Sequence, residues 1–256
     1  MLETIKVLLE ELDTDKKHMP PTTLYNRGWL LRLVLYLFSK HHITGHSLTF
    51  IPGAEWYSEG QLASTFLPVY QGDELAESYT HADGVTGHIA VGKAGRGDIF
   101  LIEPFEQFIV LEAKLFDPLA GGIKRAPEFD QVARNVACMA EVVKRSGCSV
   151  EGFRSLGFYV LAPECQINSE VTFKKYIQKE SVQQKVRQRV EAYRGRSDYE
   201  DKRKWFDQYF EPLIDKIDVS LISWEIIIDS ISTYDREMGE KLLEFYNSCL
   251  KYNKPG

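Results

Sequence analysis

The chain has 256 residues, of which 44% are hydrophobic and 12% aromatic, and its 31 basic and 37 acidic side chains give a net charge of −6. These values suit one large domain or two small ones and exclude a disordered chain. The longest apolar stretch, residues 29–38, contains Arg32 and is too short to span a bilayer, and the N-terminus lacks the basic start of a signal peptide, so we expect a cytoplasmic protein without membrane association.

The first half of the chain alternates between helical and extended patterns. A wide apolar stripe predicts a helix over residues 23–42, and Ser58 as an N-cap predicts a second helix that ends before Pro68. The hydrophobic period then changes to that of strands. Short runs rich in β-branched and aromatic residues predict three strands, over residues 84–91, 98–102 and 108–115.

The second half continues this alternation. The expected elements are a helix from Pro127 to about Arg145, a strand over 155–161, a helical segment that includes residues 171–204, a strand over 219–228, and a helix from about Ser230 to Leu250. The order of elements from residue 58 onward predicts an α/β fold with one mixed sheet flanked by helices.

Residues 171–204 carry eleven basic and five acidic side chains, whereas the rest of the chain sums to −12. Tyrosines and Trp205 are interleaved with these charges, a combination that suits a nucleic acid. The alternative is a solvated amphipathic helix, because Val182, Val186 and Val190 recur at four-residue spacing and would face a core. The two interpretations are compatible.

The run FIVLEAKL over residues 108–115 contains two charged residues, Glu112 and Lys114, in an otherwise apolar strand. Burying charge is costly unless the charge is paired or binds a metal. Because side chains alternate along a strand, both residues project from the same face. The alternative is a cross-strand ion pair on a half-exposed sheet.

A turn centred on Phe105 would pair the strand at 98–102 with the strand at 108–115 and place Asp98 opposite Glu112. Two converging carboxylates repel each other unless a cation neutralises them, and a hard divalent ion such as Mg²⁺, with Mn²⁺ as a substitute, suits oxygen ligands. With Lys114 beside the ion, this arrangement is suited to phosphodiester hydrolysis. Asp83, near the start of the preceding strand, is interpreted as a turn-forming Asp-Gly residue instead of an additional ligand.

Asp98, followed after thirteen residues by Glu112-Ala113-Lys114, resembles the PD-(D/E)xK, or restriction-endonuclease-like, nuclease superfamily. The resemblance implies an αβββαβ core over residues 58–161, with the Asp98 and Glu112 carboxylates and the Ala113 carbonyl as metal ligands and Lys114 as the catalytic cation. It also implies, with less force, a metal-reaching Glu on the helix before the strands and a Gln on the helix after them. Glu59, with Glu55 as second choice, and Gln131 match these positions.

We therefore expect one nuclease-like domain over residues 1–256. Its expected parts are a core at about 55–165, an N-terminal helical segment at 1–45, the basic helical segment at 171–210, and a C-terminal strand and helix at 219–250. The expected function is Mg²⁺-dependent cleavage of nucleic acid, DNA more than RNA, with Lys124 and Arg125 near substrate phosphates. Cutting both strands of a duplex requires two active sites, which favours a homodimer. The alternative is a non-catalytic nucleic-acid-binding or assembly module on the same scaffold.

Overall fold

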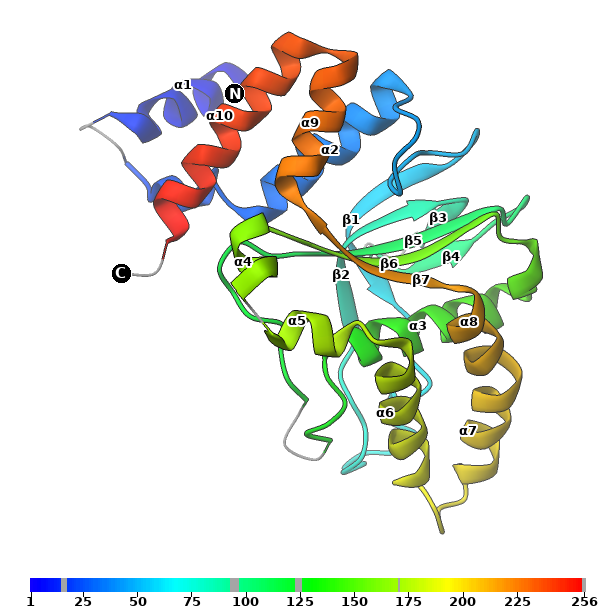
Figure 1. Ribbon diagram of the computed structural model, residues 1–256. Coiled ribbons are helices and arrows are strands. Elements are labelled where there is room, and N and C mark those ends of the chain that lie inside the picture. Colours follow the sequence, from blue (N-terminus) through cyan, green and yellow to red (C-terminus); the bar gives the residue numbers. More distant parts are fainter. Residues whose placement is uncertain (15–17, 93–96, 123–125, 170, 255–256) are drawn as a thin grey trace.

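The computed structural model describes residues 1–14, 18–92, 97–122, 126–169 and 171–254. A five-stranded mixed sheet with the order β1-β2-β5-β6-β7 lies at its centre, and β3 and β4 form a separate two-stranded ladder (Figure 1). The strands are β1 (Glu55–Leu62), β2 (Thr80–Gly87), β3 (Ile89–Val91), β4 (Ile99–Leu101), β5 (Gln107–Ala113), β6 (Ser155–Ala162) and β7 (Asp218–Ser223).

Helices cover both faces of this sheet. They are α1 (Leu2–Glu10), α2 (Arg27–His41), α3 (Gln131–Ser146), α4 (Glu164–Ser169), α5 (Val171–Tyr176), α6 (Lys179–Glu191), α7 (Tyr199–Trp205), α8 (Glu211–Lys216), α9 (Trp224–Tyr234) and α10 (Arg236–Asn253). Short 3₁₀ turns lie at Glu11–Asp13, Pro21–Thr23 and Val150–Gly152, and a π-helical turn spans Phe206–Phe210. None of the described helices is both long and apolar enough to cross a membrane.

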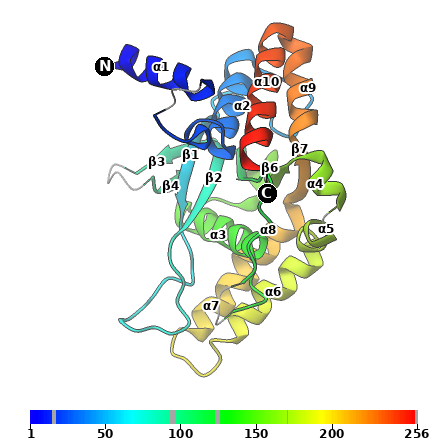
Figure 2. The ribbon, with the colours of Figure 1, turned by 90° about the vertical axis from the view of Figure 1, so that its left-hand side faces the viewer.

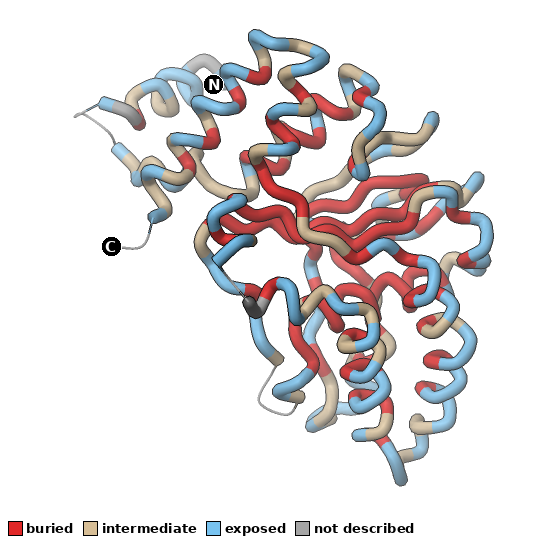
Figure 3. The backbone as a smooth tube through the Cα atoms, in the orientation of Figure 1, coloured by how far each residue is buried: buried red, intermediate tan, exposed pale blue. Residues whose placement is uncertain are grey.

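The central strands are buried on both sides, as Figure 3 shows, because each face packs against a different set of helices. On β5, Ile109 and Leu111 pack into a core with α2, α9 and α10. Phe108 and Val110 face the opposite way, into a core with α3 and α6. The sequence-based prediction of an α/β fold with a mixed sheet flanked by helices is thus confirmed.

The three predicted strands are arranged differently from the expected meander. β2 pairs with β5 and β3 pairs with β4, so the chain forms one long hairpin that bends between the two ladders. At the bend, Gly87 has φ 145°, and a Cβ there would lie 2.1 Å from the Gln107 carbonyl oxygen. Residues 102–106 are extra on the returning strand, and the His88 ring fixes them by accepting hydrogen bonds at Nδ1 from the Glu106 and Gln107 amides, both at 3.2 Å. A turn does lie at Ile102–Phe105, but the expected pairing of the strands on its two sides is wrong.

Several predicted elements change type or position. The segment from Ser58 forms strand β1 instead of a helix, because residues 55–62 pair with β2 along their length. The helix expected from Pro127 begins at Gln131, where the Asp130 side chain accepts a hydrogen bond from the Ala133 amide. The strand expected over 219–228 ends at Ser223, whose hydroxyl caps α9.

Candidate active site at the end of strand β5

Asp83, and not Asp98, lies across from Glu112. The β2–β5 pairing runs up to Gly84 opposite Leu111, and one further step brings Asp83 opposite Glu112. The Asp83 side chain replaces the next ladder bond, because its Oδ2 accepts a hydrogen bond of 2.8 Å from the Ala113 amide. Asp83 is half-buried and so remains accessible from the edge of the sheet.

Glu112 and Lys114 form a buried ion pair on the face of β5 that looks toward α3. The Lys114 Nζ lies 3.0 Å from Glu112 Oε1, and the two side chains are only 5% and 3% exposed. The pKa of Glu112 is raised to about 7, chiefly because of burial and then because of the Asp83 charge, while Lys114 acts in the opposite direction. One lysine therefore faces two carboxylates, and it does not fully compensate them.

The backbone at the end of β5 is held on one side by β6 and α9. The Lys114 amide donates to the Leu161 carbonyl of β6 at 2.7 Å, and the Trp224 indole donates to the Lys114 carbonyl at 2.8 Å. Since peptide groups alternate along a strand, the carbonyl of Ala113 points to the other side, toward β2 and Asp83. Three oxygen-bearing groups thus border one position: the two carboxylates and this carbonyl.

These groups fit a hard divalent cation. Carboxylate and carbonyl oxygens are the ligands of Mg²⁺, and a cation would relieve the repulsion that raises the pKa of Glu112. In the described part of the chain, no cluster of three or more His, Cys, Asp or Glu side chains is suitable for a metal. Two carboxylates and one carbonyl suit an ion such as Mg²⁺, which usually keeps several water ligands.

Asp98 lies on the far side of β1. It forms an isolated bridge with Gln61 of β1, and Gln61 in turn pairs with His81 of β2. Two strands thus separate Asp98 from β5, a distance of about 14 Å at the usual spacing of strands. The predicted convergence of Asp98 with Glu112 is wrong, because β4 pairs with β3 and β5 pairs with β2 instead of with each other.

Glu59 lies near the site but its side chain is turned elsewhere. In the register of β1 and β2 it is at the level of Asp83, between the pairs formed by Ser58 and Gly60. Its backbone has φ 58°, and its carboxylate, 55% exposed, lies 3.6 Å from Arg32 of α2. Glu55, the second choice, is at the exposed beginning of the same strand.

Gln131 is at the first position of α3, where its side chain fixes the preceding loop. Its side-chain Oε1 accepts a hydrogen bond of 3.0 Å from the Ala120 backbone amide, and the backbone amide of Gln131 donates to the Ala120 carbonyl. The structure therefore gives Gln131 a role in holding the connection between β5 and α3.

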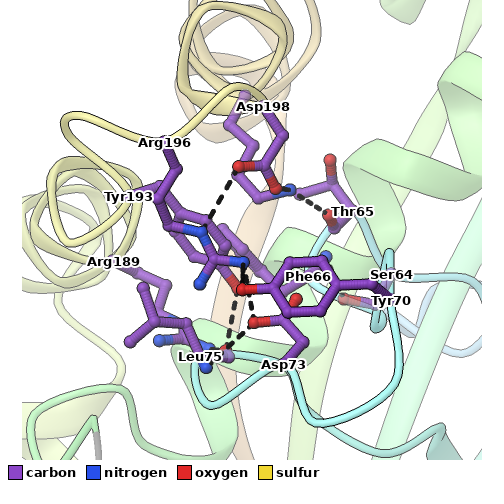
Figure 4. Close-up of polar contacts among 11 residues, drawn as sticks. Ser64, Thr65, Phe66, Tyr70, Asp73, Leu75, Arg189, Tyr193, Arg196 and Asp198 are labelled. Carbon is purple, nitrogen blue, oxygen red and sulfur yellow. Dashed lines mark hydrogen bonds and ion pairs between the residues drawn. The ribbon is translucent and has the colours of Figure 1, made fainter.

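The basic segment is largely occupied by internal contacts. Lys185 lies 2.5 Å from Asp130, Arg196 lies 2.8 Å from Asp73, and Lys202 lies 3.0 Å from Asp198. Figure 4 shows how Arg189, Tyr193 and Arg196 reach across to the loop at residues 64–75, where the first two donate to the Leu75 carbonyl. The alternative interpretation, an amphipathic helix facing a core, is confirmed for α6, because Val182, Val186 and Val190 are all buried.

Lys174 and Lys175 remain exposed in this segment, and Lys124 and Arg125 lie outside the described residues.

No known protein family, curated protein or solved structure matches the chain.

Sequence reasoning identified Glu112, Lys114 and Ala113 but missed Asp83. The available signal was the strand pattern on both sides of Asp83, with Ala82 before it and Val85-Thr86 after it, which is unlike an isolated turn.

Proposed function

We propose that the protein is a metal-dependent nuclease that hydrolyses phosphodiester bonds, with DNA favoured over RNA. The observation that supports this proposal is the convergence of Asp83, Glu112 and Lys114 at one end of the β2–β5 pair. We further propose that α2, β1, β2, β5, α3 and β6 correspond to the αβββαβ core of the restriction-endonuclease-like fold. Asp83 then takes the role expected for Asp98.

The proposed division of roles follows from the chemistry of each group. Asp83, Glu112 and the Ala113 carbonyl would hold Mg²⁺ or Mn²⁺, whose contribution is to polarise a phosphoryl oxygen and lower the pKa of water. The Lys114 ammonium lies next to the acids and is placed to stabilise negative charge that develops on the phosphate. Because the pKa of Glu112 is about 7, its carboxylate is half-ionised at neutral pH and becomes a better ligand at higher pH.

The experiment compares Asp83→Asn with Asp98→Asn, two identical changes at the two candidate aspartates. Purified protein is incubated with labelled single-stranded DNA, duplex DNA and RNA in Mg²⁺ or Mn²⁺, with EDTA as the blank. We expect wild type and Asp98→Asn to cleave at rates within about threefold of each other. Asp83→Asn and Lys114→Met should each lose about 10³-fold, the size of effect of removing a charge-stabilising group from an active site.

Two results would contradict the proposal. One is cleavage by Asp83→Asn at the wild-type rate, which would show that Asp83 has no role in the reaction. The other is the absence of metal-dependent cleavage of all three substrates by the wild type. If the wild type nevertheless binds nucleic acid in EDTA, the non-catalytic binding module replaces the nuclease.

A further inference from the structure

Helix α2 has an outer face that combines exposed aromatic rings with basic side chains. Its inner face is buried against the sheet through leucines, Val34 and Phe38. On the outer face, Trp29 is 44% exposed and Tyr36 is 51% exposed. Figure 2 shows α2 above the sheet, between α1 and α10.

Each exposed ring on this face has a cation next to it. The Arg32 guanidinium lies 5.3 Å from the centre of the Trp29 ring, and the Lys40 ammonium lies 5.6 Å from the centre of the Tyr36 ring. The helix sequence, RGWLLRLVLYLFSKH, contains no acidic residue. Flat rings interleaved with positive charge, without acids on the same helix, are complementary to bases and phosphates.

The spacing of the rings suits a single strand. Trp29 and Tyr36 are two turns apart on one face, about 10.5 Å along the helix axis. A stacked single strand covers this distance in about three nucleotides at about 3.4 Å each. A duplex hides its base faces within the stack, so exposed rings select unpaired bases.

The N-terminus of α2 lies near the end of β5 that carries the proposed active site, while the helix packs on the opposite face of the sheet from Glu112 and Lys114. At the N-terminus of α2, the Arg27 guanidinium lies 2.6 Å from the Asp117 carboxylate, and Asp117 follows Lys114 by three residues. Further along, Arg32 donates to the Ser58 hydroxyl at 2.9 Å and lies 3.6 Å from Glu59, which is level with Asp83 in the sheet. A strand that leaves the N-terminal end of α2 would therefore meet the end of β5, and the carboxylates lie at that end on the other face of the sheet.

We propose that the outer face of α2 binds single-stranded nucleic acid, with bases stacked on Trp29 and Tyr36 and phosphates near Arg32 and Lys40. This inference rests on the proposed nuclease function, and it specifies the substrate as a single strand or the single-stranded end of a duplex. Glu59 competes with phosphate for Arg32, so its neutralisation strengthens binding.

The test measures binding without cleavage. Labelled oligonucleotides of about 16 nucleotides, as single-stranded DNA, single-stranded RNA and a DNA duplex, are titrated in EDTA, and fluorescence anisotropy is recorded. We expect Trp29→Ala and Tyr36→Ala each to weaken single-strand binding about tenfold, in line with the loss of one stacked base. Trp29→Phe and Tyr36→Phe keep a ring and should stay within about threefold of wild type.

Two further variants sharpen the result. Phe100→Ala removes a ring of the β3–β4 hairpin that is 45% exposed, and it should leave the affinity unchanged. Glu59→Gln should raise the affinity for single strands about threefold, because Arg32 is released from its ion pair. Circular dichroism verifies that each variant is folded.

The proposal is overturned if the alanine variants bind single strands as tightly as wild type, or if Phe100→Ala loses as much affinity. Equal losses for duplex and single strand would also overturn it, since the rings would then not be reading unpaired bases. Because binding is measured in EDTA, a failure here leaves the cleavage test intact, and an absence of cleavage leaves the binding test intact.

Discussion

Lys114 and Lys202 are both buried lysines, each 4% exposed, yet their surroundings differ. Lys202 lies 3.0 Å from the Asp198 carboxylate and donates to the Thr65 carbonyl at 3.0 Å. Arg196 lies 3.6 Å from the same carboxylate, so this acid faces two cations. Lys114 lies 3.0 Å from Glu112, which in turn lies next to the second acid, Asp83.

The comparison shows that burial of a charge does not by itself indicate a functional site. At Lys202 the charges are balanced, and they attach α7 to the loop that joins β1 and β2. At Lys114 the acids outnumber the cation, and the pKa of Glu112 is raised, chiefly by burial and then by the Asp83 charge. The uncompensated charge is what distinguishes a candidate site from scaffold.

The largest effect on stability is expected at Lys202. Lys202→Met removes two hydrogen bonds from a charged donor, one to the Asp198 carboxylate and one to the Thr65 carbonyl. At about 1.5–3 kcal/mol each, their loss should cost about 3–5 kcal/mol of the free energy of unfolding. The exposed Lys204→Met is the matched control and should change this free energy by less than about 0.5 kcal/mol. Urea unfolding measures both. Equal stability of the two variants would break the comparison, because Lys202 would then not be part of the scaffold.

The next effect concerns pH. Between the ordinary carboxyl pKa of 4.5 and the folded value of about 7, Glu112 is ionised in the unfolded chain but protonated in the folded one. Folding therefore binds a proton in this interval. The free energy of unfolding accordingly falls as the pH rises from about 4.5 to 7. In EDTA, the unfolding free energy of wild type should fall by about 3 kcal/mol more than that of Glu112→Gln between about pH 5 and pH 8.

The control for this measurement is Glu128→Gln, an exposed position that should keep the wild-type slope. Mg²⁺ should reduce the slope of the wild type but not that of Glu112→Gln, because the ion favours the ionised carboxylate. Identical slopes for wild type and Glu112→Gln would show that the pKa of Glu112 is not raised in the folded protein.

The smallest effect is expected at Gln131, which we assign to the scaffold and not to the candidate site. Gln131→Ala removes the hydrogen bond from the Ala120 amide and should cost about 1 kcal/mol of unfolding free energy. Cleavage at saturating Mg²⁺ should stay within about threefold of wild type. A loss of 100-fold or more, about 3 kcal/mol in activation free energy, would place Gln131 in the site.

Site residues with a local signal could be predicted from the sequence, whereas contacts between distant parts of the chain could not. Glu112 and Lys114 could be found because their signal is local: two charges in one apolar strand. The strand pattern around Asp83 is also local, but its partner is not readable from the sequence. That partner depends on where the chain reverses, and residues 102–106 are inserted between β4 and β5. The segment from Asp98 to Glu112 has the length of a simple hairpin, so a plausible local pairing concealed the true one.

Other differences have the same origin. Ser58 has the residue type of an N-cap, but pairing with β2 outweighs this local preference. The charges of residues 171–204 are readable in the sequence, whereas their acidic partners are not. Asp73 and Asp130, for example, reach Arg196 and Lys185 from distant parts of the chain. Composition therefore indicated a polyanion surface where the fold uses most of these cations internally.

The bend in the long hairpin has a consequence for how this protein can change over evolution. The sheet portion of the hairpin ends at Gly87, and His88 fixes the crossing at that point, so β3 and β4 form a second ladder beyond it that packs on β1 and α3. Residues can be gained or lost between β3 and β4 without altering the alignment of Asp83 with Glu112. Among homologues, we would therefore expect the separation of these two acids along the chain to vary widely while their separation in space stays constant.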